Sequence, residues 1–141
     1  MLKRIADAGL EGQVVVDSAG THDYHVGEAP DPRTLYHAAR RGYDLSTLRA
    51  RQFQVLDYDR FDLVLAMDRG HHGRLLEGAR QHQAGKLQLF LDYAPGLQGH
   101  EVPDPYYGGS ADFERVLDLV ESAVSGLLLR LRAVDLSNGG V

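Results

Sequence analysis

The sequence predicts an α/β domain built around a parallel sheet, and two observations lead to this prediction. Short apolar runs at residues 14–16, 61–67 and 87–91, of which the last two each contain a single polar residue, are typical of strands that are covered on both faces. Segments with helical spacing of apolar residues alternate with these runs, as they do when helices connect parallel strands. A chain of 141 residues is long enough for one domain with its own hydrophobic core.

The N-terminal part of the chain is expected to form the end of a helix followed by a strand. Apolar residues within 2–6 have helical spacing, and Gly9 suits the C-terminal stop of a helix. The β-branched run at 14–16 predicts the first strand, which leads into a tight turn at residues 17–20.

A second helix is expected to begin at Asp31. The carboxylate of Asp31 can cap this helix, Pro32 suits the first helical position, and Gly42 can end it. Ser46 is a further candidate for a helix start.

The second half of the chain continues the alternation. The strand predicted at 61–67 ends in an acidic turn, a helix is expected over about 71–81, and the third strand over 87–91. Ser110 begins the last helix, which has one apolar face: Phe113, Val116, Leu117, Val120, Val124, Leu127, Leu128 and Leu131. We expect the domain to span residues 1–132, and residues 133–141 to form a disordered tail.

Composition excludes several classes of function. A net charge of −5 gives no electrostatic reason to expect nucleic-acid binding, which needs concentrated Lys and Arg. No apolar run approaches the roughly 20 residues of a membrane span. The first residues lack the apolar stretch of a signal peptide, so we expect a cytoplasmic protein without a membrane partner. The chain contains no cysteine, so the residues present offer no disulfide, thiolate metal site or cysteine nucleophile.

Asp104 is the main candidate for chemistry, because it lies between two prolines. Pro103 fixes its own φ, and Pro105 favours an extended conformation at Asp104. The carboxyl group therefore projects from a stiff loop after the third predicted strand, where open α/β sheets bind ligands. A positioned general acid requires such a loop. A rigid turn whose aspartate caps a neighbouring amide fits the same spacing equally well.

Two polar segments fit structural roles better than functional ones. The segment 18–21 follows a predicted strand and could hydrogen-bond a ligand, but such a segment is more often only a turn. His22, Asp23 and His25 lack a further ligand at suitable spacing, so we expect no metal.

Arginines cluster between residues 33 and 51, and they could attract phosphorylated substrates. A solvated helix face with ordinary ion pairs is the simpler interpretation of this cluster, which consists of Arg33, Arg40, Arg41, Arg49 and Arg51.

The Asp57-Tyr58-Asp59 motif is similar to that of aspartate-nucleophile phosphatases, but it precedes a predicted strand instead of following it. Topology therefore argues against that chemistry. No Gly-rich nucleotide motif is present.

Taken together, four segments resemble the low-molecular-weight protein tyrosine phosphatases. They are "VDSAGTHDYHVGEAPDPR" (16–33), "ARRGYDLSTLRARQ" (39–52), "FDLVLAMD" (61–68) and "DPYYGGSADFE" (104–114). They occur in the family's order, and the resemblance extends to about residue 131.

The resemblance implies a flavodoxin-like sheet and hydrolysis of phosphotyrosine through a cysteinyl-phosphate intermediate, without a cofactor. Asp104 matches the general acid that protonates the departing phenolate, whose pKa of about 10 makes it a poor leaving group when unprotonated. Tyr24 and Tyr106 match aromatic positions beside the substrate ring, and Tyr107 matches the second tyrosine of the same loop. Ser18 matches a position that supports the phosphate-binding loop.

The sequence departs from this family in one respect. The family's Cys-x5-Arg phosphate-binding loop and the strand before it have no counterpart here, and that strand is central in the family's sheet. We therefore expect Met1 to be an internal methionine of a longer reading frame, or the chain to be a fragment, and the printed chain to be inactive. The genomic sequence just upstream of the Met1 codon would decide this, because an absent in-frame Cys-x5-Arg would exclude the first explanation.

Two other functions remain open. One is a degenerate, non-catalytic domain that binds phosphoproteins. The other is an arsenate reductase on the same scaffold, which would need further redox cysteines that the chain lacks. The resemblance implies a phosphotyrosine-containing protein, such as a tyrosine kinase, as the partner.

Overall fold

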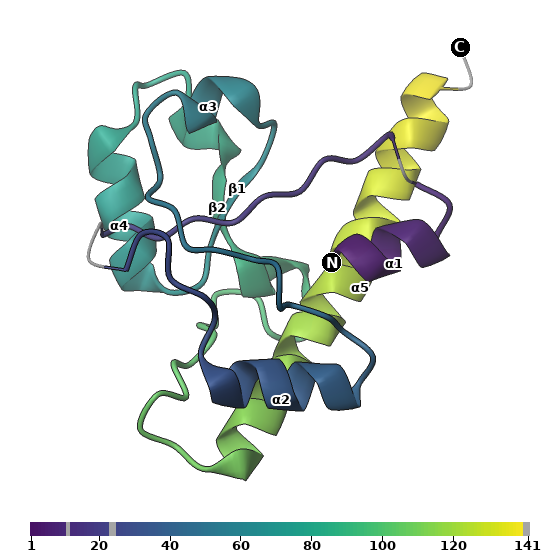
Figure 1. The fold of residues 1–141 in the computed structure, drawn as a ribbon. Coiled ribbons are helices and arrows are strands. Elements are labelled where there is room, and N and C mark those ends of the chain that lie inside the picture. Colours follow the sequence, from purple (N-terminus) through teal and green to yellow (C-terminus); the bar gives the residue numbers. More distant parts are fainter. Residues whose placement is uncertain (11, 23–24, 140–141) are drawn as a thin grey trace.

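The computed structural model describes residues 1–10, 12–22 and 25–139 (Figure 1). It confirms an α/β fold in which helices flank a small parallel sheet. The long helix α5 (Ser110–Gly139) runs along one side of the molecule, with α1 (Leu2–Asp7) and α2 (Pro32–Arg40) against it. The strands lie on the other side together with α3 (Asp57–Arg60) and α4 (Arg69–Gly78).

The sheet formed by the described residues consists of two parallel strands, β1 (Val64–Ala66) and β2 (Leu87–Leu89). Their register places Val64 opposite Leu87. Parallel neighbours need a crossover connection, which α4 supplies. The carboxyl ends of both strands therefore meet at one edge of the sheet.

Polar caps and short helical turns surround the strands. Asp68, two residues after β1, caps α4 by accepting a hydrogen bond from the His71 amide at 2.7 Å. The 3₁₀ turn η1 (Ala84–Lys86) precedes β2, and η2 (Phe90–Tyr93) follows it directly. The chain thus turns from the sheet towards α5 within a few residues.

The buried apolar side chains form two clusters. The larger cluster lies between α1, η2 and α5, and it contains Ile5, Leu10, Phe90, Leu91, Ala94, Val102, Ala123, Val124 and Leu128. The smaller cluster joins α3 to the sheet and contains Tyr58, Val64, Ala66 and Leu87. Gly126 allows the backbone of α5 to contact the carbonyl group of Tyr93. This close approach brings α5 against η2.

Charged side chains tie α2 to α5. The guanidinium of Arg41 lies 2.9 Å from Asp118 and 2.5 Å from Glu121, and it also contacts Glu114. The hydrogen bond to Glu121 raises the pKa of Arg41 above its ordinary value. Buried His37 also reaches the same helix, with Nδ1 3.0 Å from Glu114. These contacts fix the orientation of α2.

The expected helices are largely confirmed. Asp31 caps α2 through a 2.8 Å hydrogen bond from the Arg33 amide, and Gly9 follows α1 with a φ of +72°. Helix α5 begins at Ser110, as the sequence predicts. Among the clustered arginines, Arg33, Arg41 and Arg51 form ion pairs, as expected, and a role of the cluster in attracting phosphorylated substrates stays a prediction.

The prediction of a strand at 14–16 is wrong. No described segment forms a ladder with these residues, and Val15 is 79% exposed. A strand requires a hydrogen-bonded neighbour, and here pairing begins only at the isolated parallel bridge between Gly20 and Gln52. The strands predicted at 61–67 and 87–91 are present, but each is only three residues long.

The helix start proposed at Ser46 is also wrong, since residues 46–47 form a turn. The carboxylate of Asp44 accepts the Ser46 amide at 2.9 Å, and Arg49 donates to the carbonyls of Ser46 and Leu48. These side-chain bonds replace those that a helix would make.

Helix α5 continues to Gly139, through most of the segment 133–141 that we expect to be disordered; residues 140–141 lie outside the described residues. The disorder of that segment stays a prediction. Over the part of the chain that the structure describes, no helix combines the length and apolarity needed to cross a membrane.

Candidate functional site

The loop of residues 103–109, here called the acid loop, is held at its base and closed by its own hydrogen bonds. The Val102 amide donates to the carbonyl of Met67 at 2.8 Å, which fixes the loop beside the end of β1. Within the loop, the Tyr106 amide donates to Oδ1 of Asp104 at 3.0 Å, and the Gly108 amide donates to the Pro105 carbonyl at 2.8 Å. The carboxylate of Asp104 is exposed and has a fixed orientation.

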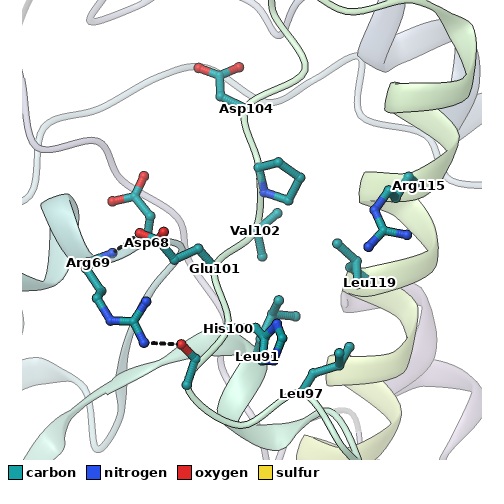
Figure 2. Close-up of a pocket in the computed structure, with 12 residues that line it drawn as sticks. Asp68, Arg69, Leu91, Leu97, His100, Glu101, Val102, Asp104, Arg115 and Leu119 are labelled. Carbon is teal, nitrogen blue, oxygen red and sulfur yellow. Dashed lines mark hydrogen bonds between the residues drawn. The ribbon is translucent and has the colours of Figure 1, made fainter.

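A pocket of about 660 Å³ lies below this loop (Figure 2). The start of α4 forms one wall, residues 97–104 form the second, and α5 forms the third. Leu91, Leu97 and Leu119 provide an apolar floor, whereas Asp104 lies at the rim with its oxygens directed away from the leucines. The pocket thus joins a carboxylate to an apolar surface at the carboxyl edge of the sheet.

Most of the other charged groups around the pocket have hydrogen-bond partners. Glu101 accepts the Arg69 amide at 2.7 Å, and the Arg69 guanidinium donates to the carbonyl of Gly99. In contrast, the side chains of Arg115 and His100 form no hydrogen bond or ion pair with any described residue. In Figure 2, Arg115 extends from α5 on the side of the pocket opposite Arg69. The pocket therefore has a guanidinium available for an anion.

The aromatic residues of the acid loop lie on its outer side. The rings of Tyr106 and Tyr107 meet edge to face with centroids 4.9 Å apart. Tyr106 is 57% exposed, and Tyr107 is 97% exposed. Neither ring lines the pocket, so both are available to a group that approaches the loop from solvent.

The structure brings some of the predicted site residues together and leaves others apart. Asp104, Tyr106 and Tyr107 share the acid loop, but only Asp104 borders the pocket. Ser18 is exposed, its amide donates to its neighbour Asp17 at 2.8 Å, and among the described residues no hydrogen bond joins it to the acid loop. Tyr24 lies outside the described residues.

Five polar residues of the pocket were not singled out from the sequence: Asp68, Arg69, His100, Glu101 and Arg115. Asp68 and Arg69 follow the strand that ends in the predicted acidic turn, and that position could have indicated them. Arg115 lies on a helix whose apolar periodicity gives no information about its polar face. Only the tertiary packing of α5 against the acid loop brings it to the pocket.

The fold and the pocket define an α/β protein with a pocket at the carboxyl ends of its parallel strands. Residues 1–136 match the family model described as low molecular weight phosphotyrosine protein phosphatase. The chain belongs to this family.

Proteins of known name and known structure agree with this assignment. A low molecular weight protein-tyrosine-phosphatase of Streptomyces coelicolor is 46% identical over 132 residues, which cover 92% of this chain and 80% of the relative. Protein-tyrosine phosphatase A of Mycobacterium tuberculosis is 35% identical over 127 residues, which cover 89% of this chain and 76% of the relative.

Two solved structures extend the similarity to the fold. The crystal structure of a protein tyrosine phosphatase from Entamoeba histolytica superposes with a TM-score of 0.86 at 32% identity, covering 99% of this chain and 85% of that one. The YfkJ protein of Bacillus subtilis superposes with a TM-score of 0.85 at 33% identity, covering 93% and 81% of the two chains.

Proposed function

We propose that this domain hydrolyses phosphotyrosine monoesters in proteins and that Asp104 is its general acid. The observation that carries the proposal is the position of Asp104, which projects from a proline-bounded loop at the rim of a pocket in a chain of this phosphatase family. A proton donor has to reach the ester oxygen of a bound phosphotyrosine without being buried away from solvent. An exposed carboxyl on a stiff loop meets both requirements.

In the proposed reaction, a thiolate attacks phosphorus, and the bond to the phenolic oxygen breaks. Asp104 gives its proton to that oxygen, so tyrosine leaves as a neutral phenol. The Asp104 carboxylate then takes a proton from the water that attacks phosphorus; the phosphorus–sulfur bond breaks, phosphate is released, and the thiolate and the protonated Asp104 are restored. Tyr106 and Tyr24 would contact the substrate ring, Tyr107 would extend this aromatic surface, and Ser18 would support the phosphate-binding loop.

The thiolate does not come from the printed residues, because the chain contains no cysteine. We therefore propose that the chain as printed supplies the acid and the aromatic contacts but does not turn over substrate alone. Its partner would be a phosphotyrosine-containing protein of the cytoplasm, such as a tyrosine kinase.

A second candidate function is phosphoprotein binding without catalysis. The absence of cysteine favours this alternative, and the guanidinium of Arg115, which pairs with no described residue, offers an anion contact in the pocket. A general acid has no role in binding alone, so the preserved Asp104 loop favours the phosphatase.

Hydrolysis of para-nitrophenyl phosphate tests these alternatives. The 141-residue chain should show no turnover, whereas an extended chain, which carries a Cys-x5-Arg loop and the strand before it at its N-terminus, should be active at mildly acidic pH. Asp104→Asn in the extended chain should lower that activity. Turnover by the printed chain would contradict the cysteine-dependent mechanism. A folded extended chain that binds a phosphotyrosine peptide without hydrolysing it would favour the binding domain.

A further inference from the structure

Arg33 links helix α2 to the acid loop across 73 positions of sequence. Its Nη1 donates a hydrogen bond to the backbone carbonyl of Tyr106 at 2.8 Å. The amide of the same residue, Tyr106, donates to the Asp104 carboxylate at 3.0 Å. The backbone of Tyr106 is therefore held by Arg33 at its carbonyl and by Asp104 at its amide.

The guanidinium of Arg33 is itself held in place. The Asp31 carboxylate accepts hydrogen bonds from Nε of Arg33 at 3.1 Å and from Nη2 at 2.8 Å. The two side chains thus form a bidentate pair that fixes the guanidinium plane. Asp31 also accepts the Arg33 amide as the cap of α2. The hydrogen bond from the Arg33 side chain lowers the pKa of Asp31, which keeps the pair ionised at neutral pH. The remaining nitrogen, Nη1, is thereby aimed at the acid loop.

Two aromatic rings complete the environment of Arg33. Its guanidinium carbon lies 5.4 Å from the centroid of Tyr106 and 4.9 Å from that of Phe113, in the first turn of α5. Both distances are within the range of cation–π attraction. Arg33 thus contacts the acid loop and the helix that follows it.

The acid loop has few other attachments. Apart from the bond with Arg33, the described side-chain hydrogen bonds of residues 103–109 lie within the loop or run from the Gly109 amide to the Asp112 carboxylate in the following helix. Glycines at 108 and 109 add backbone freedom to this segment. A cross-chain contact at Tyr106 therefore has a large effect on where the loop lies.

We propose that Arg33 is a positioning residue that fixes the acid loop and, through the backbone of Tyr106, the orientation of Asp104. The inference rests on the proposed function, because it assigns Arg33 a purpose in presenting the acid. It differs from an ordinary ion pair on a helix surface, since the Asp31–Arg33 pair directs a free N–H into a loop of another part of the chain.

Amide hydrogen exchange in the 141-residue chain tests this assignment by NMR, with Arg33→Ala and Arg33→Lys as the variants. Loss of a hydrogen bond from a charged donor should speed exchange of the Tyr106 and Gly108 amides by about tenfold in Arg33→Ala. Arg33→Lys keeps a charged donor without the fork and should restore part of the protection. Arg40→Ala is the matched control, because Arg40 is in the same helix, packs over Tyr36 and forms no hydrogen bond or ion pair with the described residues of the acid loop.

The amides of β1 and β2 report whether the fold as a whole has loosened. Unchanged exchange at Tyr106 and Gly108 in Arg33→Ala would overturn the proposal, as would an equal rise at the strand amides. A lysine variant no better protected than the alanine variant would also contradict it. None of these readouts needs turnover, so their failure would leave the phosphatase proposal standing, and a negative phosphatase assay would leave the role of Arg33 in the loop standing.

Discussion

Replacing Gly126 with alanine should destabilise the protein, although the same change usually stabilises a helix. Gly126 lies inside α5, where alanine is favoured over glycine by about 1 kcal/mol. A Cβ at this position, however, would overlap the carbonyl oxygen of Tyr93 and lie 3.0 Å from its carbonyl carbon. Tyr93 ends η2, and its backbone cannot rotate away as a flexible side chain could.

The size of this effect follows from comparing the cost of the overlap with the gain in helix propensity. Relieving the overlap requires α5 to move away from η2, which disturbs the larger cluster at Leu91, Ala94 and Ala123. Overpacking of this kind costs about 1–3 kcal/mol, and backbone contact places Gly126 at the upper end of that range. After the gain in helix propensity, we expect a net loss of about 2 kcal/mol. In a domain of this size that lowers the Tm by about 6–8 °C.

Chemical denaturation followed by circular dichroism would measure the change, with Gly73→Ala as the control. Gly73 lies in α4, and a Cβ there meets no atom within 4 Å, so alanine should raise the free energy of unfolding by about 0.5–1 kcal/mol. If both variants were stabilised equally, the close packing of α5 on η2 would be refuted.

Three further perturbations test the charged and polar contacts by the same denaturation assay. Burial alone would raise the pKa of Asp57, but hydrogen bonds from Arg51 and a backbone amide outweigh it and hold that pKa below its ordinary value. The Asp57 carboxylate therefore stabilises the fold at pH values above about 4, the pKa of an aspartate in the unfolded chain. This contribution is lost as pH falls through the lower pKa that Asp57 has in the folded protein. Asp57→Asn should remove that acid dependence. Burial raises the pKa of Tyr58, so the free energy of unfolding should fall as pH rises above about 10. The Tyr58 hydroxyl donates to the carbonyl of Leu75 at 2.6 Å, so Tyr58→Phe should cost about 1–2 kcal/mol and abolish this alkaline dependence. Arg41→Ala should cost about 1 kcal/mol, and less in high salt, because it removes the cation that three carboxylates of α5 share; an effect independent of salt would contradict an electrostatic role.

Local signals in the sequence predicted the helices well. Asp31 and Pro32 indicated the start of α2 because capping and a fixed φ are properties of the residues themselves. The three- and four-residue spacing of apolar side chains indicated the face of α5 that packs on η2. Helix α3, which is four residues long, was missed because it has no such period.

Features that depend on distant residues were less predictable. The β-branched run at 14–16 has strand propensity, but no described segment pairs with it. At the site, the prolines around Asp104 identified a stiff acid-bearing loop from sequence alone. Arg33 and Arg115 reach this region only through the packing of α2 and α5, and the spacing of residues along the chain does not encode that contact.

The central claim is that Asp104 protonates the leaving group, and the leaving-group dependence of hydrolysis tests it most directly. In the extended chain, Asp104→Asn should slow turnover of phenyl phosphate, whose phenol has a pKa of about 10, by a hundredfold or more, as expected for loss of a general acid. The same variant should lose far less with 2,4-dinitrophenyl phosphate, because that phenolate leaves without a proton. An equal loss with both substrates would contradict the account, since Asp104 would then not be the proton donor.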